Sequence, residues 1–259
     1  MLPAELLGKI DRVRRWLDEA ERVVALTGAG ISTDSGIPDY RGPNGVWTKD
    51  PDAEKTATLG NYLGDEEVRR RAWRGRLSSP AWTAEPNAGH RALVELVRRG
   101  KLHALVTQNV DGLHQKAGVP PELVVEVHGT IHYVVCWDCG ERAPMERALA
   151  RVAAGEDDPH CRTCGGILKS DTISFGQALV PSVIDRALRV AEEGDVLLAV
   201  GTSLQVYPVA NMVPRAKAAG RRVVIVNGEP TPYDELANAV IRGPIGELLP
   251  VLLSGVVDT

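Results

Sequence analysis

Short aliphatic runs recur along the chain and alternate with longer amphipathic stretches. Five of these runs predict buried strands, at residues 22–27, 103–107, 123–127, 196–200 and 222–226. Stretches with helical spacing lie between several of them, at residues 88–99, 181–193 and 208–219. This alternation is typical of an α/β fold with a doubly wound, parallel, Rossmann-like sheet. The carboxyl ends of such strands share one edge of the sheet, and ligands bind there, beside the switch in strand order.

The N-terminal segment has the pattern of an amphipathic helix. Its apolar side chains recur at helical spacing, at Leu6, Leu7, Ile10, Val13, Trp16 and Leu17. We expect this helix to pack on the fold as structural cover.

Two segments depart from the alternation. Residues 49–76 are polar and charged and predict a helical insertion or loop, whereas residues 131–171 hold all four cysteines and predict a small module of their own. The larger domain would then comprise residues 1–48, 77–130 and 172–259. The insertion carries a cluster of arginines set among acidic residues, at Arg69, Arg70, Arg71, Arg74 and Arg76. We interpret this cluster as a solvated helix face, with an anion site as the alternative.

Composition and charge narrow the class of protein. Thirty Lys and Arg against 34 Asp and Glu give a net charge of −4, which argues against a dedicated nucleic-acid binder. Hydrophobic residues make up 44% of the chain, and no apolar run approaches the roughly 20 residues that a membrane span needs. The N-terminus lacks the apolar core of a signal peptide. We therefore expect a soluble, cytoplasmic protein that binds neither nucleic acid nor membrane.

The four cysteines form two Cys-x-x-Cys pairs, and each pair is followed by glycine. Cys136 and Cys139 make the first pair, and Cys161 and Cys164 make the second. This spacing is typical of a zinc site, and four thiolates would fill a tetrahedral shell and leave no position for substrate. We predict one structural zinc ion; a redox pair or two disulfides are the alternatives.

A glycine-rich loop follows the first predicted strand. Its sequence, Thr27-Gly-Ala-Gly-Ile-Ser-Thr33, leads toward a predicted helix, so its backbone N–H groups could hold phosphate. The loop lacks the third glycine of the dinucleotide fingerprint, and no acidic residue ends a second strand about 20 residues later. Any ribose contacts would come from the far half of the sheet, where Asn227 and Glu229 follow a strand. The alternative is a glycine turn that only permits close packing.

Three more predicted strands end in polar residues. Gln108, Asn109 and Asp111 follow one, and Thr202 and Ser203 follow another. His128 follows a third strand and so lies at the same edge. A histidine there could act as general acid or base, although a lone histidine is more often structural. Glu126, on the same face of that strand, could orient the imidazole ring or could simply be solvated.

These motifs, in their order along the chain, resemble the sirtuin family. The resemblance rests on the glycine-rich loop, residues 36–42, residues 107–114, His128-Gly129, the four cysteines, residues 201–203 and residues 226–229, and it spans residues 20–250. It implies an NAD-dependent protein lysine deacylase with a large NAD-binding domain, a small zinc module and an acyl-lysine cleft between them. In the family reaction the acyl group passes from lysine to ADP-ribose and nicotinamide is released.

The resemblance also implies roles for individual residues. His128 would be the general base, with Asn109 and Asp111 completing the catalytic set. The implied cofactor-binding residues are Gly28, Ala29, Gly30, Ser32, Thr33, Asp39, Tyr40, Arg41, Trp47, Gln108, Asn109, Asp111, Gly201, Thr202, Ser203, Asn227, Gly228, Glu229 and Ile245. Two segments would flank the peptide substrate, residues 175–177 as a pairing strand and residues 206–209 as the other wall.

One motif that some members of the family have is missing from this chain, and its absence bears on the acyl group that the enzyme would prefer. The Tyr-x-x-Arg pair by which some members read acidic acyl groups is absent, and Trp73-Arg-Gly-Arg76 is the nearest pattern. We therefore expect neutral acyl groups to be preferred, on protein or peptide substrates, by a monomeric enzyme. Two alternatives are a protein mono-ADP-ribosyltransferase and a noncatalytic module that senses NAD.

Overall fold

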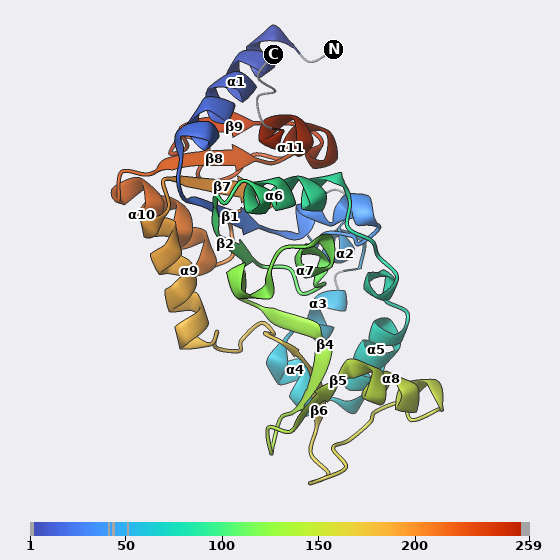
Figure 1. Cartoon of the computed structure of the whole chain (residues 1–259). Coiled ribbons are helices and arrows are strands. Elements are labelled where there is room, and N and C mark those ends of the chain that lie inside the picture. Colours follow the sequence, from blue (N-terminus) through green and yellow to red (C-terminus); the bar gives the residue numbers. More distant parts are fainter. Residues whose placement is uncertain (1–2, 41, 43–44, 51, 255–259) are drawn as a thin grey trace.

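The computed structural model describes residues 3–40, 42, 45–50 and 52–254, and its centre is a six-stranded parallel sheet (Figure 1). The strand order is β3-β2-β1-β7-β8-β9. The bounds are Val23–Thr27 for β1, Leu102–Thr107 for β2, Val124–Glu126 for β3, Val196–Val200 for β7, Arg222–Val226 for β8 and Ala239–Ile241 for β9. The predicted α/β fold and all five predicted strands are confirmed, and β9 is an addition.

The last residues of all six strands lie in one row across the sheet. Thr27 pairs with Thr107 on one side and with Val200 on the other, and Thr107 pairs with Glu126. Val226 continues the row from Val200, and Ile241 ends it. The order of the strands reverses between β1 and β7. The loops that leave the strands therefore start at one level, on both sides of the switch point where ligands bind in such sheets.

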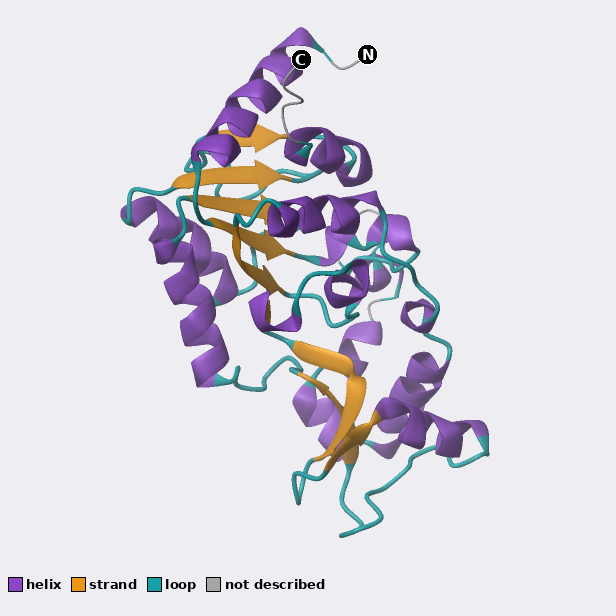
Figure 2. Ribbon diagram, in the orientation of Figure 1, coloured by secondary structure: helices purple, strands orange, loops and turns teal. Residues whose placement is uncertain are grey.

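Helices cover both faces of the sheet (Figure 2). One buried apolar cluster joins a face of the sheet to α1 (Ala4–Glu19), α6 (Ala88–Arg98) and α11 (Ile245–Leu253). A second cluster joins the opposite face to α9 (Pro181–Glu193) and α10 (Met212–Ala218). The remaining short helices are α7 (Leu113–Ala117), η1 (Ala29–Ile31), η2 (Thr33–Ser35), η3 (Pro80–Trp82), η4 (Pro121–Leu123) and η5 (Val209–Asn211).

The predicted N-terminal helix is α1, and its apolar stripe is only partly buried. Ile10, Val13 and Leu17 lie in the core, whereas 44% of Leu7 is exposed.

A second, antiparallel sheet of three strands lies apart from the large one (Figure 2). It consists of β5 (Arg142–Pro144), β4 (Gly129–Cys136) and β6 (Leu168–Thr172), in that order, with α8 (Met145–Ala153) packed against β4. The predicted cysteine module falls here, although β4 already begins at Gly129, directly after His128. Only residues 127 and 128 therefore separate β3 of the large sheet from β4 of the small one.

Among the described residues, the insertion holds α3 (Ala53–Thr56), α4 (Leu59–Gly64) and α5 (Glu66–Leu77), and α2 (Val46–Lys49) ends at its first residue. Trp73 on α5 is completely buried in an apolar cluster with the module. The interpretation of the arginines as one solvated face is wrong for Arg69, whose buried side chain pairs with Asp158 at 2.8 Å. It holds for Arg70, which pairs with Glu66 and Glu67 at the surface.

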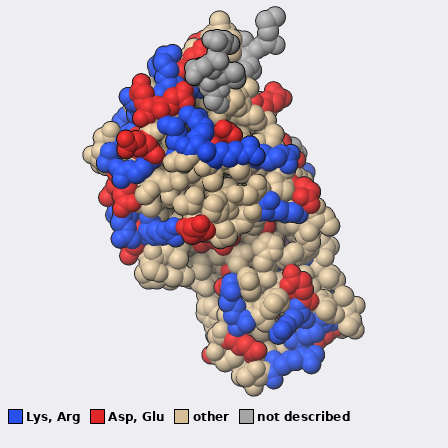
Figure 3. Space-filling view, in the orientation of Figure 1, with Lys and Arg blue, Asp and Glu red and all other residues tan. Residues whose placement is uncertain are grey.

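Lys and Arg side chains are interspersed with Asp and Glu over the face shown in Figure 3. Within the described part of the chain, every helix is too short or too polar to cross a bilayer.

Candidate active site

One large cavity opens at the carboxyl edge of the parallel sheet, with a volume of about 1380 Å³. Loops after β1, β2, β7 and β8 line one side, and the insertion and the small module line the other. The structure brings these predicted site residues to its wall: Gly28, Ala29, Gly30, Asp39, Tyr40, Trp47, Gln108, Asn109, His128, Gly201, Thr202, Ser203, Asn227 and Glu229. Predicted residues from distant parts of the sequence thus share one cavity.

The glycine-rich loop after β1 touches the loop after β7. A Cβ atom on Gly28 or Gly30 would lie 2.8 or 2.9 Å from the carbonyl oxygen of Gly201, so only glycine fits at either position. The N–H of Gly28 donates to Val200 and that of Gly30 to Gly201, at 3.1 and 2.9 Å. These glycines therefore permit close packing of the two loops, and their own N–H groups are bonded to backbone carbonyls, while Gly28, Ala29 and Gly30 all line the cavity.

The segment after this loop is not the predicted α-helix. It forms two three-residue 3-10 turns, η1 and η2. Among the described residues, the N–H of Ala29 on the cavity wall has no partner. That group, not a helix N-terminus, is the donor that this loop offers to a ligand.

A chain of hydrogen bonds joins Asn109, Ser32 and Asp111 behind the cavity wall. The amide of Asn109 donates to the Ser32 hydroxyl at 3.1 Å, and that hydroxyl donates to Asp111 at 2.8 Å. The other carboxylate oxygen of Asp111 accepts from the backbone N–H of Leu113 at 2.9 Å. All three side chains are buried. Ser32 and Asp111 therefore fix the position of Asn109 on the wall.

Two buried histidines lie directly under this chain. His90 Nε2 is 3.4 Å from the Ser32 hydroxyl, and His114 Nε2 is 2.9 Å from the hydroxyl of Thr27. Burial lowers the pKa of His90 to about 4 and that of His114 to about 3, because the charged imidazolium would lose its hydration. Both rings are neutral at ordinary pH.

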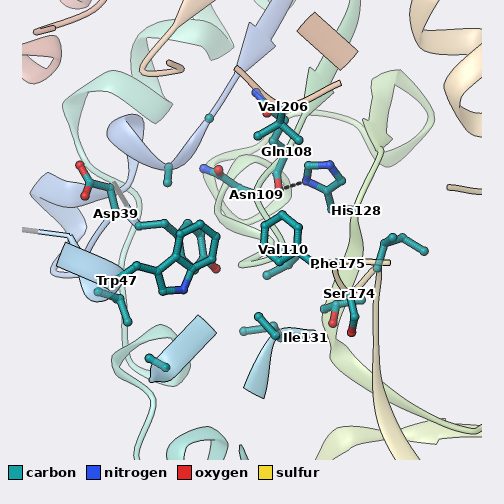
Figure 4. Close-up of a pocket in the computed structure, with 18 of the residues that line it drawn as sticks. Asp39, Trp47, Gln108, Asn109, Val110, His128, Ile131, Ser174, Phe175 and Val206 are labelled. Carbon is teal, nitrogen blue, oxygen red and sulfur yellow. Dashed lines mark hydrogen bonds between the residues drawn. The ribbon is translucent and has the colours of Figure 1, made fainter. Parts of the chain in front are cut away.

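His128 occupies the position predicted for it, at the end of β3 and on the cavity wall (Figure 4). Its Nδ1 lies 3.0 Å from the carbonyl oxygen of Gln108. A carbonyl only accepts, so Nδ1 carries the proton and the neutral ring presents Nε2 with a free lone pair. Burial lowers the pKa of His128, and the bond to Gln108 opposes that shift. The ring is thus a neutral base near pH 7.

The hypothesis that Glu126 orients the imidazole of His128 is wrong. The carboxylate of Glu126 accepts a hydrogen bond from the side chain of Gln115 at 3.0 Å. The backbone of Gln108 performs the orienting role instead, and no side-chain pattern in the sequence signals it. The side chain of Gln108 donates to the Thr202 hydroxyl at 2.9 Å, which links the β2 and β7 loops.

Three aromatic rings stand in a row across the cavity. The rings of Tyr40 and Trp47 are 4.8 Å apart, and those of Trp47 and Phe175 are 5.2 Å apart. Asp39 accepts a hydrogen bond from the N–H of Gly42 at 3.0 Å and so closes the loop that carries Tyr40. Arg41, which the sequence also assigns to the cofactor, lies outside the described residues.

Five predicted cofactor residues do not line the cavity: Ser32, Thr33, Asp111, Gly228 and Ile245. The hydroxyl of Thr33 donates to the carbonyl of Gly30 at 3.0 Å. Ile245 packs against the apolar core, and a Cβ atom on Gly201 would lie 3.0 Å from its Cδ1. These residues support the loops; only Asn227 and Glu229 of their segment reach the cavity.

The segments expected to flank a peptide are not strands in this structure. Phe175 forms an isolated bridge with Thr58, and residues 206–208 make a turn. Both segments still line the cavity through Phe175 and Val206.

Two apolar residues beside His128 went unrecognised in the sequence, namely Val110 and Ile131 (Figure 4). Val110 is a single apolar residue between Asn109 and Asp111, and that isolation could have identified it. Ile131 lies close to other apolar residues of β4, so no pattern in the sequence distinguishes it.

The four cysteines of the small module converge. Their sulfur atoms all lie within 4.8 Å of one another, with 3.5 Å between Cys136 and Cys164 and 3.8 Å between Cys139 and Cys161. A disulfide bond is about 2.05 Å long. Four sulfurs at about 2.3 Å from a tetrahedral zinc lie about 3.8 Å apart. The geometry therefore fits a zinc site and not two disulfides.

The family model for the Sir2 family matches residues 28–208. NAD-dependent protein deacetylase 2 of Streptomyces coelicolor is 57% identical over 233 residues, which cover 90% of this chain and 97% of the relative. This chain belongs to the Sir2 family. Because sirtuins are its members, the resemblance found in the sequence is confirmed.

Solved structures of Sir2 proteins have the same fold. One, from work on the mechanism and regulation of Sir2 enzymes, superposes with a TM-score of 0.87 at 36% identity and covers 95% of this chain and 96% of its own. Another holds a deacetylated p53 peptide and 3′-O-acetyl ADP ribose, with a TM-score of 0.87 at 30% identity and coverage of 94% and 97%.

Proposed function

We propose that this Sir2 protein is an NAD-dependent protein lysine deacetylase, which transfers the acyl group of an acyl-lysine to ADP-ribose with release of nicotinamide. The observation that carries the proposal is the imidazole of His128, whose unprotonated Nε2 faces the same cavity as the glycine-rich loop and the polar strand ends. The deacetylase relative and the acetyl ADP ribose complex described above support the same reaction.

The cavity fits a dinucleotide. Gly28 and Gly30 let the chain approach a ligand closely, and Ala29 offers an N–H for the pyrophosphate. Thr202 and Ser203 would bind phosphate and ribose, whereas Asn227 and Glu229, at the end of β8, would bind the adenosine ribose. When bound, NAD supplies a ribose carbon from which nicotinamide departs and a hydroxyl that accepts the acyl group.

The residues of this chain contribute position and one base. Asn109 is held by Ser32 and Asp111, so its amide can fix the reacting ribose and acyl group in line. His128 takes a proton from a ribose hydroxyl at its Nε2. Such a base contributes about 10²–10⁴-fold to the rate when its pKa lies near the working pH. Val110, Ile131 and Phe175 would exclude water from the acyl-lysine.

The cysteine set would hold one structural zinc ion, since four thiolates complete a tetrahedral shell. We also propose the division into an NAD-binding domain of residues 1–48, 77–130 and 172–259, an insertion of residues 49–76 and a zinc module of residues 131–171. Cytoplasmic location, monomeric state and the identity of the protein substrates stay predictions.

One experiment separates the proposed activity from its two alternatives. An acetyl-lysine peptide is incubated with NAD and the protein, and the peptide mass is then measured. We expect the loss of one acetyl group, with equimolar nicotinamide. A gain of ADP-ribose would indicate a mono-ADP-ribosyltransferase, and an unchanged peptide together with measurable NAD binding would indicate a sensor module.

A further inference from the structure

The β2 loop, residues 108–112, lies against the segment that joins the two sheets. Its first carbonyl, that of Gln108, accepts a hydrogen bond from the ring of His128 at 3.0 Å (Figure 4). Its third carbonyl, that of Val110, accepts from the backbone N–H of Ile131, also at 3.0 Å. The base and the loop that faces it are therefore held together through backbone carbonyls.

The ring of His132 makes a third contact of this kind. Its Nε2 lies 3.0 Å from the backbone carbonyl oxygen of Asp111. Because a carbonyl only accepts, Nε2 carries a proton and donates the hydrogen bond. Within the described chain, no other donor reaches that carbonyl. A side chain of the small module thus supplies the partner of a carbonyl in the β2 loop.

The bond to His132 matters because Asp111 has little access to solvent. Only 8% of Asp111 is exposed, and the β2 loop belongs to no helix or strand that could satisfy its backbone. A buried carbonyl without a partner costs about as much free energy as a lost hydrogen bond. Loss of the donor on His132 would therefore favour a displaced loop.

Asp111 is also the residue that fixes Asn109. Its carboxylate accepts from the hydroxyl of Ser32, and that hydroxyl accepts from the amide of Asn109. Ser32 therefore holds the side chain of Asp111, and His132 holds its main chain. A displaced main chain would move the carboxylate and, with it, the amide that positions the reacting ribose.

The ring of His132 is closely packed in its position. A Cβ atom on Gly112 would lie only 2.6 Å from Nε2, and Gly112 has a φ of +74°, in the left-handed region that favours glycine. The ring also meets that of Trp82 edge to face, with 5.9 Å between the ring centres. The indole N–H of Trp82 in turn donates to a backbone carbonyl of α5 at 2.6 Å. These contacts restrict the rotation of the imidazole.

His132 does not face the reactants. Ile131 lines the cavity and His132 does not, as expected for neighbouring residues of a strand. The proton on Nε2 stays in the bond to Asp111 whether or not the other ring nitrogen is also protonated. The imidazole of His132 is therefore placed to hold the loop and not to transfer a proton.

We propose that His132 is a positioning residue of the reaction, which holds the main chain of Asp111 and so sets the geometry between Asn109 and His128. This inference rests on the proposed function, and it gives the small module a part in catalysis besides its zinc site. The sequence gives no sign of this role, because the partner of His132 is a backbone carbonyl 21 residues away.

The test compares two substitutions at this position. His132→Phe keeps a ring against Gly112 and Trp82 but removes the donor, whereas His132→Gln keeps an N–H that can reach the carbonyl. His103→Phe is the matched control, because His103 lies near the opposite end of β2, partly exposed beside Glu193. For each protein, kcat and the KM values for an acetyl-lysine peptide and for NAD are measured by nicotinamide release across a range of pH.

We expect His132→Phe to lower kcat by roughly tenfold to a hundredfold, because a small misplacement of reacting groups costs that much, and to change either KM by less than about threefold. His132→Gln and His103→Phe should stay within about threefold of the wild type in kcat. The midpoint of the pH dependence should be the same in all the proteins, because His128 remains the base. Equal losses in both His132 variants, or a shifted midpoint, would overturn the inference.

Hydrogen exchange tests the bond without turnover and so separates this inference from the proposed function. The amide of Leu113 is bonded to the carboxylate of Asp111, and the amide of Ile131 to the carbonyl of Val110. We expect His132→Phe to speed the exchange of both amides by about tenfold or more, and His132→Gln to leave both near the wild-type rate. Unchanged exchange in His132→Phe would overturn the inference, as would faster exchange with an unchanged kcat. A wild type that turns over no acyl peptide would overturn the deacetylase proposal, and with it the kinetic role of His132, even where the exchange rates confirm the bond.

Nitrogen NMR of the wild type tests the same bond without any variant. We expect the imidazole of His132 to carry a proton on Nε2 at neutral pH, because that proton makes the bond to Asp111. A ring that is protonated at Nδ1 alone could not donate to the carbonyl and would overturn the inference, even if His132→Phe fails to fold.

Discussion

Acidification should destabilise this fold through the two histidines beneath the active site. In the folded protein burial lowers the pKa of His90 to about 4 and that of His114 to about 3, against 6.5 for either residue in an unfolded chain. The unfolded state therefore binds more protons than the folded state below pH 6.5. The stability that the neutral rings provide is fully present above pH 6.5 and is lost as the pH falls from there toward the folded pKa values.

The size of the effect follows from these pKa values. At pH 4.5 an unfolded histidine is almost entirely protonated, whereas His114 is still neutral in the fold, so its contribution to the free energy of unfolding falls by roughly 2–3 kcal/mol. His90 contributes a fall of similar size, roughly 2–3 kcal/mol. A total of roughly 5 kcal/mol is a large part of the 5–15 kcal/mol by which domains are stable.

Urea unfolding followed by circular dichroism, at pH 7.0 and pH 4.5, measures this loss. Carboxylates and the zinc thiolates also titrate in this range, so the comparison is between variants. His114→Gln can keep a hydrogen bond to Thr27 but cannot become charged, so its loss of stability between the two pH values should be roughly 2–3 kcal/mol smaller than that of the wild type. His103→Gln is the control, because His103 is partly exposed beside Glu193. Identical pH dependence in both variants and the wild type would refute the reasoning.

Three other predictions concern the site and the metal. We expect His128→Ala to lower turnover about 10²–10⁴-fold and to leave NAD affinity nearly unchanged, because the ring transfers a proton and does not hold the cofactor. Nicotinamide release measures the turnover, and calorimetry measures the NAD affinity. Near-normal turnover by the folded variant would contradict the role of His128 as the general base. Ser32→Ala removes the partner of the buried Asn109 side-chain amide and of one of the two carboxylate oxygens of Asp111, so the free energy of unfolding should fall by roughly 2–4 kcal/mol and turnover should drop as well. An unchanged urea midpoint would show that the chain of hydrogen bonds does not matter. Elemental analysis should find one zinc per chain, and Cys136→Ser should lose both the zinc and the folded module; an active, reduced protein without zinc would exclude this assignment.

The sequence predicts the parallel sheet well because its signal is local. Strands β1, β7 and β8 are nearly unbroken aliphatic runs, and glycine or asparagine follows each of them, so both the strand and its functional end are visible in the sequence. Strand β9 escapes because three residues, Ala239–Ile241, carry no pattern that separates a strand from a loop. The right-handed crossover then places all strand ends on one edge, which is why sequence patterns alone are enough to group His128, Asn109 and Gly201.

The orientation of the side chains within the site could not be predicted, because it depends on backbone groups from other segments. The ring of His128 is fixed by the carbonyl of Gln108, and a carbonyl is present at every residue, so no sequence pattern distinguishes it. Glu126 is a chemically reasonable partner for His128, but in the fold its carboxylate accepts a hydrogen bond from Gln115 instead. The glycine-rich loop likewise depends on how closely the β7 loop approaches it.

The arginines of α5 show why composition alone misjudges a charged helix. Five arginines among three acidic residues suggest that the charges neutralise one another at the surface. In a helix, however, the arginines point in different directions around the helix axis. Arg69 and Arg76 are about 20° from alignment over two turns, and they share their face with Trp73, whereas Arg70 points elsewhere. The ion-pair partner then decides the role of each inward arginine. Arg69 pairs with a buried acid and is structural, whereas Arg76 lines the cavity and pairs with no acid of the described residues.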